Sequence, residues 1–247
     1  MEARSSRQAR RVAAAIASLA VIGMVISGCA AGDQGRPAAS ASQDEARQAV
    51  FAQLELRADA GMAINVAKSL AEFLPNRLFS SEGEEPAPKA AGIVVGHVTA
   101  VSEGRAYVVV GDDADSDTEV PFDTKDPLWQ TIDVTLEISQ GWGEFTDAST
   151  VSFAAFVDGS EDPQSVMNNY SKLGQIIVVL GPAGDYTYDP TLYRVAGSST
   201  LIGTVGDDGT ISFPAKRELE EEFLHETPTL DDLDTAAAED EVIVTRE

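Results

Sequence analysis

The pattern of hydrophobic positions divides the chain into a helical first part and a β-rich second part. From Asp44 to Leu74, apolar residues recur at every third or fourth position, which is the spacing of a helix that buries one face. We therefore predict a helical segment over residues 44–80, whose regular part ends before Pro75. The residues that follow, 80–91, are largely polar and predict an exposed linker.

Residues 92–214 consist of short runs with the residue types of β-strands. Within residues 129–138, Ile132, Val134 and Leu136 alternate with polar residues, which predicts a strand with one face in water. Residues 175–180 are apolar throughout and predict a buried strand. Further strands are predicted at residues 93–101, 105–110, 151–157, 201–205 and 210–213.

Short turns join these predicted strands. We expect turns at Ser102-Glu103-Gly104, at 141–143 and at 206–209, and one short helix at 165–173. Because no long helix separates neighbouring strands, parallel pairing is disfavoured. The sequence therefore predicts a mainly β fold, a small antiparallel β-barrel or sandwich with flanking N-terminal and C-terminal helices.

This layout resembles the small OB-like and netrin-like barrels of some bacterial lipoproteins. The resemblance rests on Gly96-His97-Val98 in the first strand, on an alternating strand that ends at Gly141, on the apolar strand and on the closing Asp-Gly hairpin. Gln140 stands where that pattern has a lysine. Such barrels have unrelated functions, so the resemblance implies a fold and no particular activity.

After Pro214 the chain becomes acidic. Residues 218–247 contain twelve Asp and Glu and a single Arg. We expect residues 215–247 to form an acidic helical tail, with short helices at 216–225 and 229–238, the second of them capped by Thr229. A charge run of this kind is typical of a solvated face or a frayed tail, and a docking tail is the alternative.

The charge of the chain excludes several classes of partner. The formal net charge is −24 at pH 7. Nucleic-acid binding requires a basic face that displaces counterions, so we expect no nucleic-acid partner. Electrostatic docking on an anionic bilayer is excluded for the same reason. Any attachment to a membrane then has to come from a lipid or an apolar segment.

The N-terminus carries the most specific motif. Residues 1–11 are basic, and residues 12–26 form an uncharged run whose length suits the apolar region of a signal peptide and is short for a membrane span. The run ends in Ile26, Ser27, Gly28 and Cys29, which resembles the bacterial lipobox. A plain secretory signal, an anchor helix and a twin-arginine signal are the alternatives.

The lipobox resemblance implies a chemical modification. Residues 1–28 are expected to be a cleaved signal peptide, and Cys29 to receive a diacylglycerol through a thioether and to become the first mature residue. Cys29 is the only cysteine, so no disulfide can form within the chain. Residues 29–43 are small and polar, and predict a flexible tether between the lipid and the domain.

Candidate binding residues lie in two predicted loops. Asp113, Asp115 and Asp117 alternate like the first ligands of a calcium loop, but Thr118 stands where the turn glycine belongs, so a solvated hairpin loop is the preferred interpretation. A second set of residues, next to turns, forms either an exposed platform for a sugar or peptide or a plug for the barrel end: Trp142, Tyr186 and Tyr188.

Catalytic motifs do not stand out. The two histidines, His97 and His225, lie in a predicted strand and in the acidic tail, without a nucleophile motif, and we expect a structural role for His97. We therefore expect a lipid-anchored binding or accessory protein without a cofactor, on the extracytoplasmic face of the cell membrane, whose partner is an envelope protein, a glycan or a peptide. The alternatives are an envelope hydrolase with paired carboxylates and a structural subunit of a membrane complex.

Overall fold

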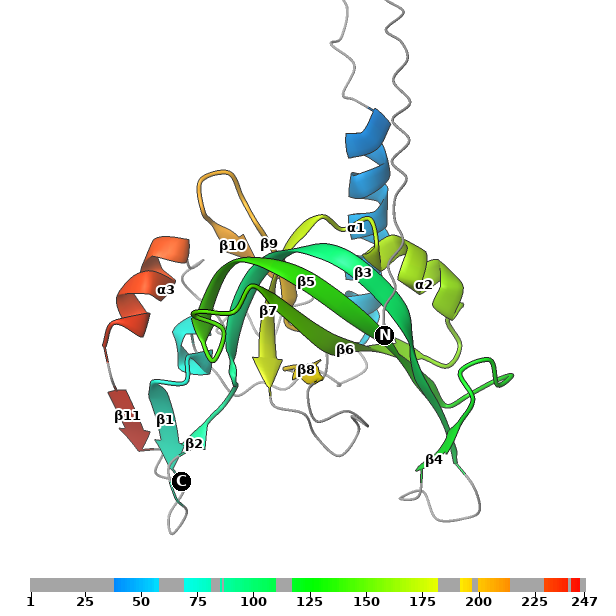
Figure 1. The fold of residues 1–247 in the computed structure, drawn as a ribbon, viewed down its shortest axis with the longest axis horizontal. Coiled ribbons are helices and arrows are strands. Elements are labelled where there is room, and N and C mark those ends of the chain that lie inside the picture. Colours follow the sequence, from blue (N-terminus) through cyan, green and yellow to red (C-terminus); the bar gives the residue numbers. More distant parts are fainter. Residues whose placement is uncertain are drawn as a thin grey trace, which may run out of the picture. The chain divides into compact units, whose positions relative to one another are not determined.

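The fold is built on one large sheet, which Figure 1 shows in a computed structural model. The structure describes residues 38–57, 69–80, 85, 87–109, 117–181, 192–196, 200–213, 229–239 and 241–244. Eight of the described strands belong to this sheet: β3 (Gly92–Val109), β4 (Asp117–Val120), β5 (Trp129–Gly143), β6 (Thr150–Asp158), β7 (Gln175–Gly181), β8 (Tyr193–Val195), β9 (Ile202–Val205) and β10 (Ile211–Ser212).

Five strands of the sheet close into a ring. β3 pairs with β5, β5 with β6, β6 with β8, β8 with β7, and β7 pairs again with β3. The predicted mainly β, OB-like barrel is thus confirmed, and five is the number of strands in an OB-fold barrel. One detail differs from the prediction, because β6 and β8 run parallel.

The barrel core follows the predicted alternation of β5. Ile132, Val134 and Leu136 are fully buried, and the residues between them, Asp133 and Thr135, are only partly buried on the other face. Strand β7 is buried along nearly its whole length, and it pairs with β3 on one edge and with β8 and β9 on the other. The alternating strand and the continuous apolar strand therefore have the two environments that their patterns predict.

The turn predicted at Ser102-Glu103-Gly104 is wrong. β3 continues through these residues and stays paired with β5, with register shifts that mark irregularities in the strand. A methyl group on Gly104 would lie 2.5 Å from the carbonyl oxygen of Thr131, so glycine is needed here for close approach of two backbones. The turn predicted at 141–143 is also displaced, since β5 extends to Gly143 and the turn follows it at 144–147.

Two helices accompany the barrel. Helix α1 (Ala38–Arg57) contacts helix α2 (Pro163–Tyr170), which connects β6 to β7 and confirms the short helix predicted there. The buried side chains of α1 lie four residues apart, at Ala46, Val50 and Leu54. Among the helices that the structure describes, none combines the length and apolar character needed to cross a membrane.

Side chains of α1 attach it to the loop after α2. The Nε2 atom of Gln43 and the Nε atom of Arg47 donate to the carbonyl oxygen of Leu173 at 3.0 and 3.1 Å, and Arg47 also donates to Gln175. The predicted tether over 29–43 is therefore too long, because residues 38–43 already belong to the helix. The rest of that tether lies outside the described residues.

A second, smaller sheet corrects the predicted helical segment and linker. After the 3₁₀ helix η2 (Leu70–Phe73), the chain forms β1 (Arg77–Ser80), so residues 44–80 are not helical throughout. β1 lies between β2 (Ala87–Pro88) and β11 (Glu241–Val244), and it pairs with β11 in parallel. Residues 80–91 are therefore not simply an exposed linker.

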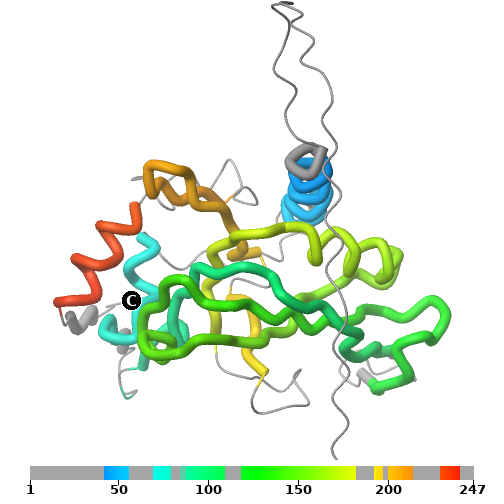
Figure 2. Tube along the Cα trace, turned by 45° about the horizontal axis from the view of Figure 1, so that its top comes forward, coloured from blue at the N-terminus to red at the C-terminus, as the bar shows by residue number. Residues whose placement is uncertain are grey.

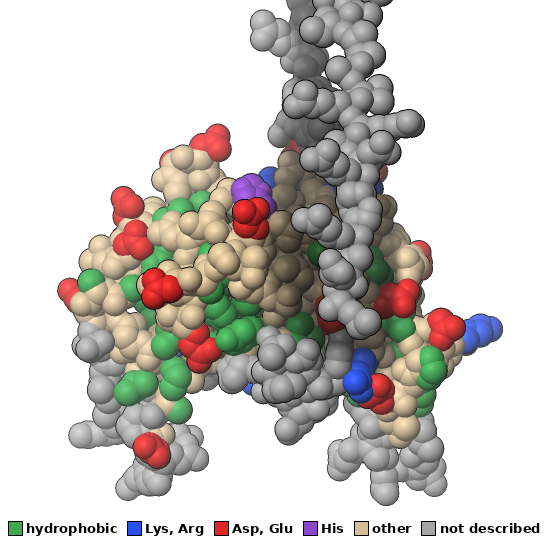
Figure 3. Space-filling model, in the orientation of Figure 1, with side chains coloured by type: hydrophobic (Ala, Val, Ile, Leu, Met, Phe, Trp, Pro, Cys, Tyr) green, Lys and Arg blue, Asp and Glu red, His purple; other side chains and the backbone are tan. Residues whose placement is uncertain are grey.

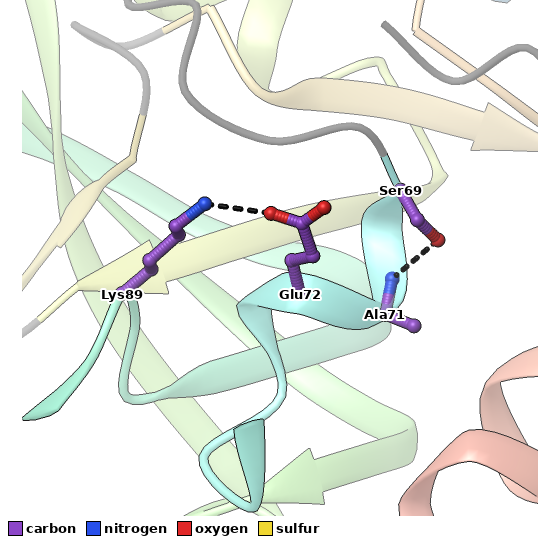
Figure 4. A network of polar contacts seen from close by, with 4 residues as sticks. All are labelled: Ser69, Ala71, Glu72 and Lys89. Carbon is purple, nitrogen blue, oxygen red and sulfur yellow. Dashed lines mark hydrogen bonds and ion pairs between the residues drawn. The ribbon is translucent and has the colours of Figure 1, made fainter. Parts of the chain in front are cut away.

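Polar contacts fix η2 beside the start of β3. Figure 4 shows the Nζ atom of Lys89 paired with the Oε2 atom of Glu72 at 2.6 Å. In the same view, the hydroxyl of Ser69 accepts a hydrogen bond from the N–H of Ala71 at 3.3 Å, which caps η2. The Lys89–Glu72 pair joins η2 to the segment that enters the barrel, and the Ser69 cap fixes the start of η2 itself.

The C-terminal helix confirms the predicted cap. Helix α3 (Leu230–Ala237) begins after Thr229, whose side chain and that of Asp232 form a reciprocal capping box. Figures 1 and 2 both show α3 beside η2 and β1, and Leu233 is buried. The acidic tail is thus partly a docked element, whereas the helix predicted at 216–225 lies outside the described residues.

The capping box predicts a loss of stability in acid. The N–H and the hydroxyl of Thr229 donate to the Asp232 carboxylate at 2.8 Å and lower its pKa from the ordinary value of an aspartate. A lowered folded-state pKa stabilises the protein above the unfolded-state value, and this stabilisation is lost as pH falls through the folded-state value. Between about pH 5 and about pH 3, the urea midpoint of the wild type should therefore fall more than that of Asp232→Asn.

The matched control for this experiment is Asp231→Asn, because Asp231 is exposed in the same turn of α3 and takes no part in the capping box. It should keep the wild-type acid sensitivity. Equal acid sensitivity of Asp232→Asn and the wild type would contradict the role given to the cap.

Candidate functional site

Several predicted site residues lie outside the described part of the chain. These are the lipobox residues Ile26, Ser27, Gly28 and Cys29, the loop residues Asp113, Asp115, Tyr186 and Tyr188, and His225. Asp117 is the first residue of β4 in this structure, and its side chain is likewise not described. Among the side chains that are described, no group of three or more His, Cys, Asp or Glu could hold a metal ion.

Trp142 does not belong to an exposed platform. Its side chain is only 4% exposed, and its indole N–H donates to the Oδ1 atom of Asp234 on α3 at 2.8 Å. Gln140, two residues earlier on β5, donates to the same carboxylate. Trp142 therefore fixes the C-terminal helix to the barrel and offers no ring face to a ligand.

His97 lies exposed on β3, in register with Glu137 of β5. The pair sits on the outer face of the barrel. This placement agrees with the predicted strand.

An aromatic stack, which the sequence analysis missed, crosses one end of the β3–β5–β6 surface. The rings of Tyr107 and Trp129 lie 3.9 Å apart between centroids, at an interplanar angle of 17°. Trp129 also stacks on Phe156, with the centroids 5.6 Å apart. One residue comes from each of three neighbouring strands, so the stack fixes the three strands together at this end.

The loop between β4 and β5, residues 121–128, is held beside this stack by hydrogen bonds. The Nε2 atom of Gln130, a residue only 2% exposed, donates to the carbonyl oxygen of Phe122 at 2.7 Å. The N–H of Leu128 donates to the carbonyl oxygen of Tyr107 at 2.8 Å, and the carbonyl oxygen of Leu128 accepts from the N–H of Gly159 at 3.2 Å. The buried amide of Gln130, strand β3 and the turn residue Gly159 thus fix the backbone of the loop.

The loop 121–128 contains a residue other than glycine with a positive φ. Asp126 has a φ of 53°, and in the described part of the chain no other residue except glycine has a positive φ. Aspartate tolerates this left-handed conformation better than most residues, but it still costs free energy. Such a conformation persists only where the surrounding structure determines it.

The same loop presents an exposed apolar side chain. Leu128 is 51% exposed, and no other large hydrophobic side chain in the described part of the chain is as exposed. Nearby, the side chain of Lys125 is 91% exposed and that of Asp126 is 85% exposed. In Figure 3, acidic side chains are spread over the visible face, and the largest blue areas lie over the end that carries β4.

This arrangement offers a surface for contact with another molecule. An exposed leucine and a lysine on a fixed loop supply apolar area and a positive charge, as binding loops on rigid scaffolds do. Pro121 and Pro127 were a visible sign of a rigid turn, but the exposure of Leu128 could not be inferred from its position before a predicted strand. Comparison with models of known families, with curated proteins and with solved structures gave no match.

Proposed function

We propose that the protein is a lipid-anchored binding or accessory protein of the cell envelope, on the extracytoplasmic face of the membrane. The observation that carries this proposal is the lipobox-like sequence Ile26-Ser27-Gly28-Cys29 at the end of an uncharged run. A thiol at that position is the group that a lipid donor modifies. Two acyl chains then give stable anchoring, which one chain does not.

The described domain supports a binding role over a catalytic one. Its most unusual exposed feature is the loop 121–128, where Asp126 has a positive φ, the buried amide of Gln130 bonds the loop backbone, and the Leu128 side chain is exposed. The strongly negative net charge disfavours polyanionic ligands, which leaves proteins and neutral glycans as partner classes.

Mass spectrometry of the mature N-terminus tests the anchor. The protein is isolated from the membranes of cells grown with an alkyne-bearing fatty acid. We expect a mature chain that starts at Cys29 and carries the label on its N-terminal peptide. An unlabelled chain, or one that begins at another residue, would contradict lipid attachment and leave an ordinary secretory signal.

A further inference from the structure

We propose that the loop 121–128 is the contact site for a protein partner, with Leu128 inserted into an apolar pocket of that partner and Lys125 beside a carboxylate at its rim. This inference rests on the proposed binding function and names its site and the chemistry of its partner.

The first argument is the fixed conformation of the loop. A surface leucine alone needs no explanation, since single exposed apolar residues are common. Here, however, the backbone N–H of Leu128 donates to Tyr107 on β3, and its carbonyl oxygen accepts from Gly159, which follows β6. Gln130 is also buried, with its amide bonded to the loop. A loop whose backbone is already fixed loses little further backbone entropy on binding, which favours it as the support of an anchor residue.

The second argument is the strain at Asp126. In a flexible surface loop, an aspartate with a positive φ would return to a conformation of lower free energy, because no neighbouring group would oppose the change. The loop keeps this conformation next to the exposed Leu128. The cost is offset elsewhere in the fold, which is expected where the loop geometry serves recognition.

The third argument concerns charge and selects the partner. The chain carries a net charge of −24, so a basic side chain that is 91% exposed stands out from its surroundings. The Nζ atom of Lys125 is 3.8 Å from the Oδ2 atom of Asp126, and both side chains are highly exposed, so this weak pair leaves the lysine free to turn to a partner. A polyanion or an anionic bilayer would meet repulsion from the rest of the surface, whereas one carboxylate beside an apolar pocket would not.

Site-specific crosslinking in native membranes tests the contact. The photoreactive residue p-benzoylphenylalanine replaces Leu128 in the full chain, and in a matched control it replaces Asn168, which is exposed on α2. We expect a discrete protein adduct from position 128 and none of the same mass from position 168. An adduct with lipid or glycan at position 128, or the same protein adduct from both positions, would overturn the proposal.

The Kd for the identified partner then measures how much Leu128 and Lys125 each contribute to binding. The adduct protein is identified, purified and titrated against the full chain in detergent. Leu128→Ser should raise the Kd by about tenfold or more, as for an anchor residue, and Asn168→Ser should leave it within about twofold. Lys125→Gln should weaken binding by about twofold to fivefold at low salt and less at high salt.

Two substitutions of Asp126 test the loop conformation independently of the anchor residue. Asp126→Gly permits the positive φ and should change the Kd only slightly, whereas Asp126→Val opposes it and should raise the Kd by about tenfold although Asp126 is not the anchor. Urea midpoints of all variants separate unfolding from loss of contact. Unchanged binding by Leu128→Ser would overturn the inference, and it would leave the lipid label on Cys29 and the proposed anchor untouched.

Discussion

Replacing Cys29 by alanine is expected to abolish fatty-acid labelling and to leave a precursor that is larger by residues 1–28. Each methylene group buried in a bilayer contributes about 0.8 kcal/mol, so the loss of two acyl chains removes more than about 10 kcal/mol of membrane binding. The uncharged run at 12–26 is short for a membrane span, so we expect it to hold the precursor more weakly than two acyl chains would. Alkaline extraction of membranes measures the loss of membrane binding. Electrophoresis of the extracted protein shows the size of the precursor and the loss of the fatty-acid label.

The matched control is Ala30→Ser, which changes a small residue on the other side of the expected cleavage site. It should be labelled, cleaved and retained in membranes like the wild type. A labelled product of mature size from Cys29→Ala would show that the lipid, if present, is attached elsewhere, and it would remove the basis of the proposed function.

Trp142→Ala is expected to cause the largest loss of folding stability among single substitutions at the described sites discussed here, about 3–5 kcal/mol. The ring is 4% exposed, and its removal leaves a cavity where β5 meets the C-terminal helix. The substitution also removes the hydrogen bond to Asp234, which contributes about 1 kcal/mol. Urea denaturation followed by fluorescence and circular dichroism gives the free energy of unfolding.

Two further variants separate the ring from its hydrogen bond. Trp142→Phe keeps most of the apolar contact and should cost less than half as much as the alanine variant. Gln140→Ala removes a longer contact to the same carboxylate and should cost less than about 1 kcal/mol. If Trp142→Ala cost as little as Gln140→Ala, the C-terminal helix would not depend on this contact.

Local sequence signals predicted local structure well. Thr229 and Asp232 stand three residues apart, the spacing of a capping box, and the helix begins there. Gly206-Asp207-Asp208-Gly209 predicted the turn between β9 and β10, and Gly209 has the positive φ that such a turn requires. In both cases the residues that determine the structure are neighbours in the chain.

Local sequence signals gave wrong predictions where a residue's structure depends on a segment that is distant in the sequence. Ser102-Glu103-Gly104 has the composition of a turn, but Gly104 is explained by the backbone of Thr131 on another strand. Strands β1, β8 and β11 were missed because each is short and depends on pairing with distant segments. A sequence pattern cannot distinguish a glycine that turns the chain from one that admits a neighbouring strand.

The candidate site, the loop 121–128 beside the aromatic stack, could not be predicted from local sequence patterns for a similar reason. Trp129 was assigned to a strand, but nothing in the local sequence placed Tyr107 and Phe156 against it. The positive φ of Asp126 and the exposure of Leu128 arise from hydrogen bonds to β3, to Gln130 and to Gly159. These contacts exist only once the barrel has formed.

The closed ring also determines when the chain can fold. Gly92 pairs with Leu180, although most of the β-domain lies between them in the sequence. The barrel therefore cannot close until β7 has been synthesised. Pairing between distant segments slows folding, because the entropy of loop closure is lost before the contacts form. A chain that folds late stays unfolded for longer after synthesis, and this would favour the export that we propose for this protein.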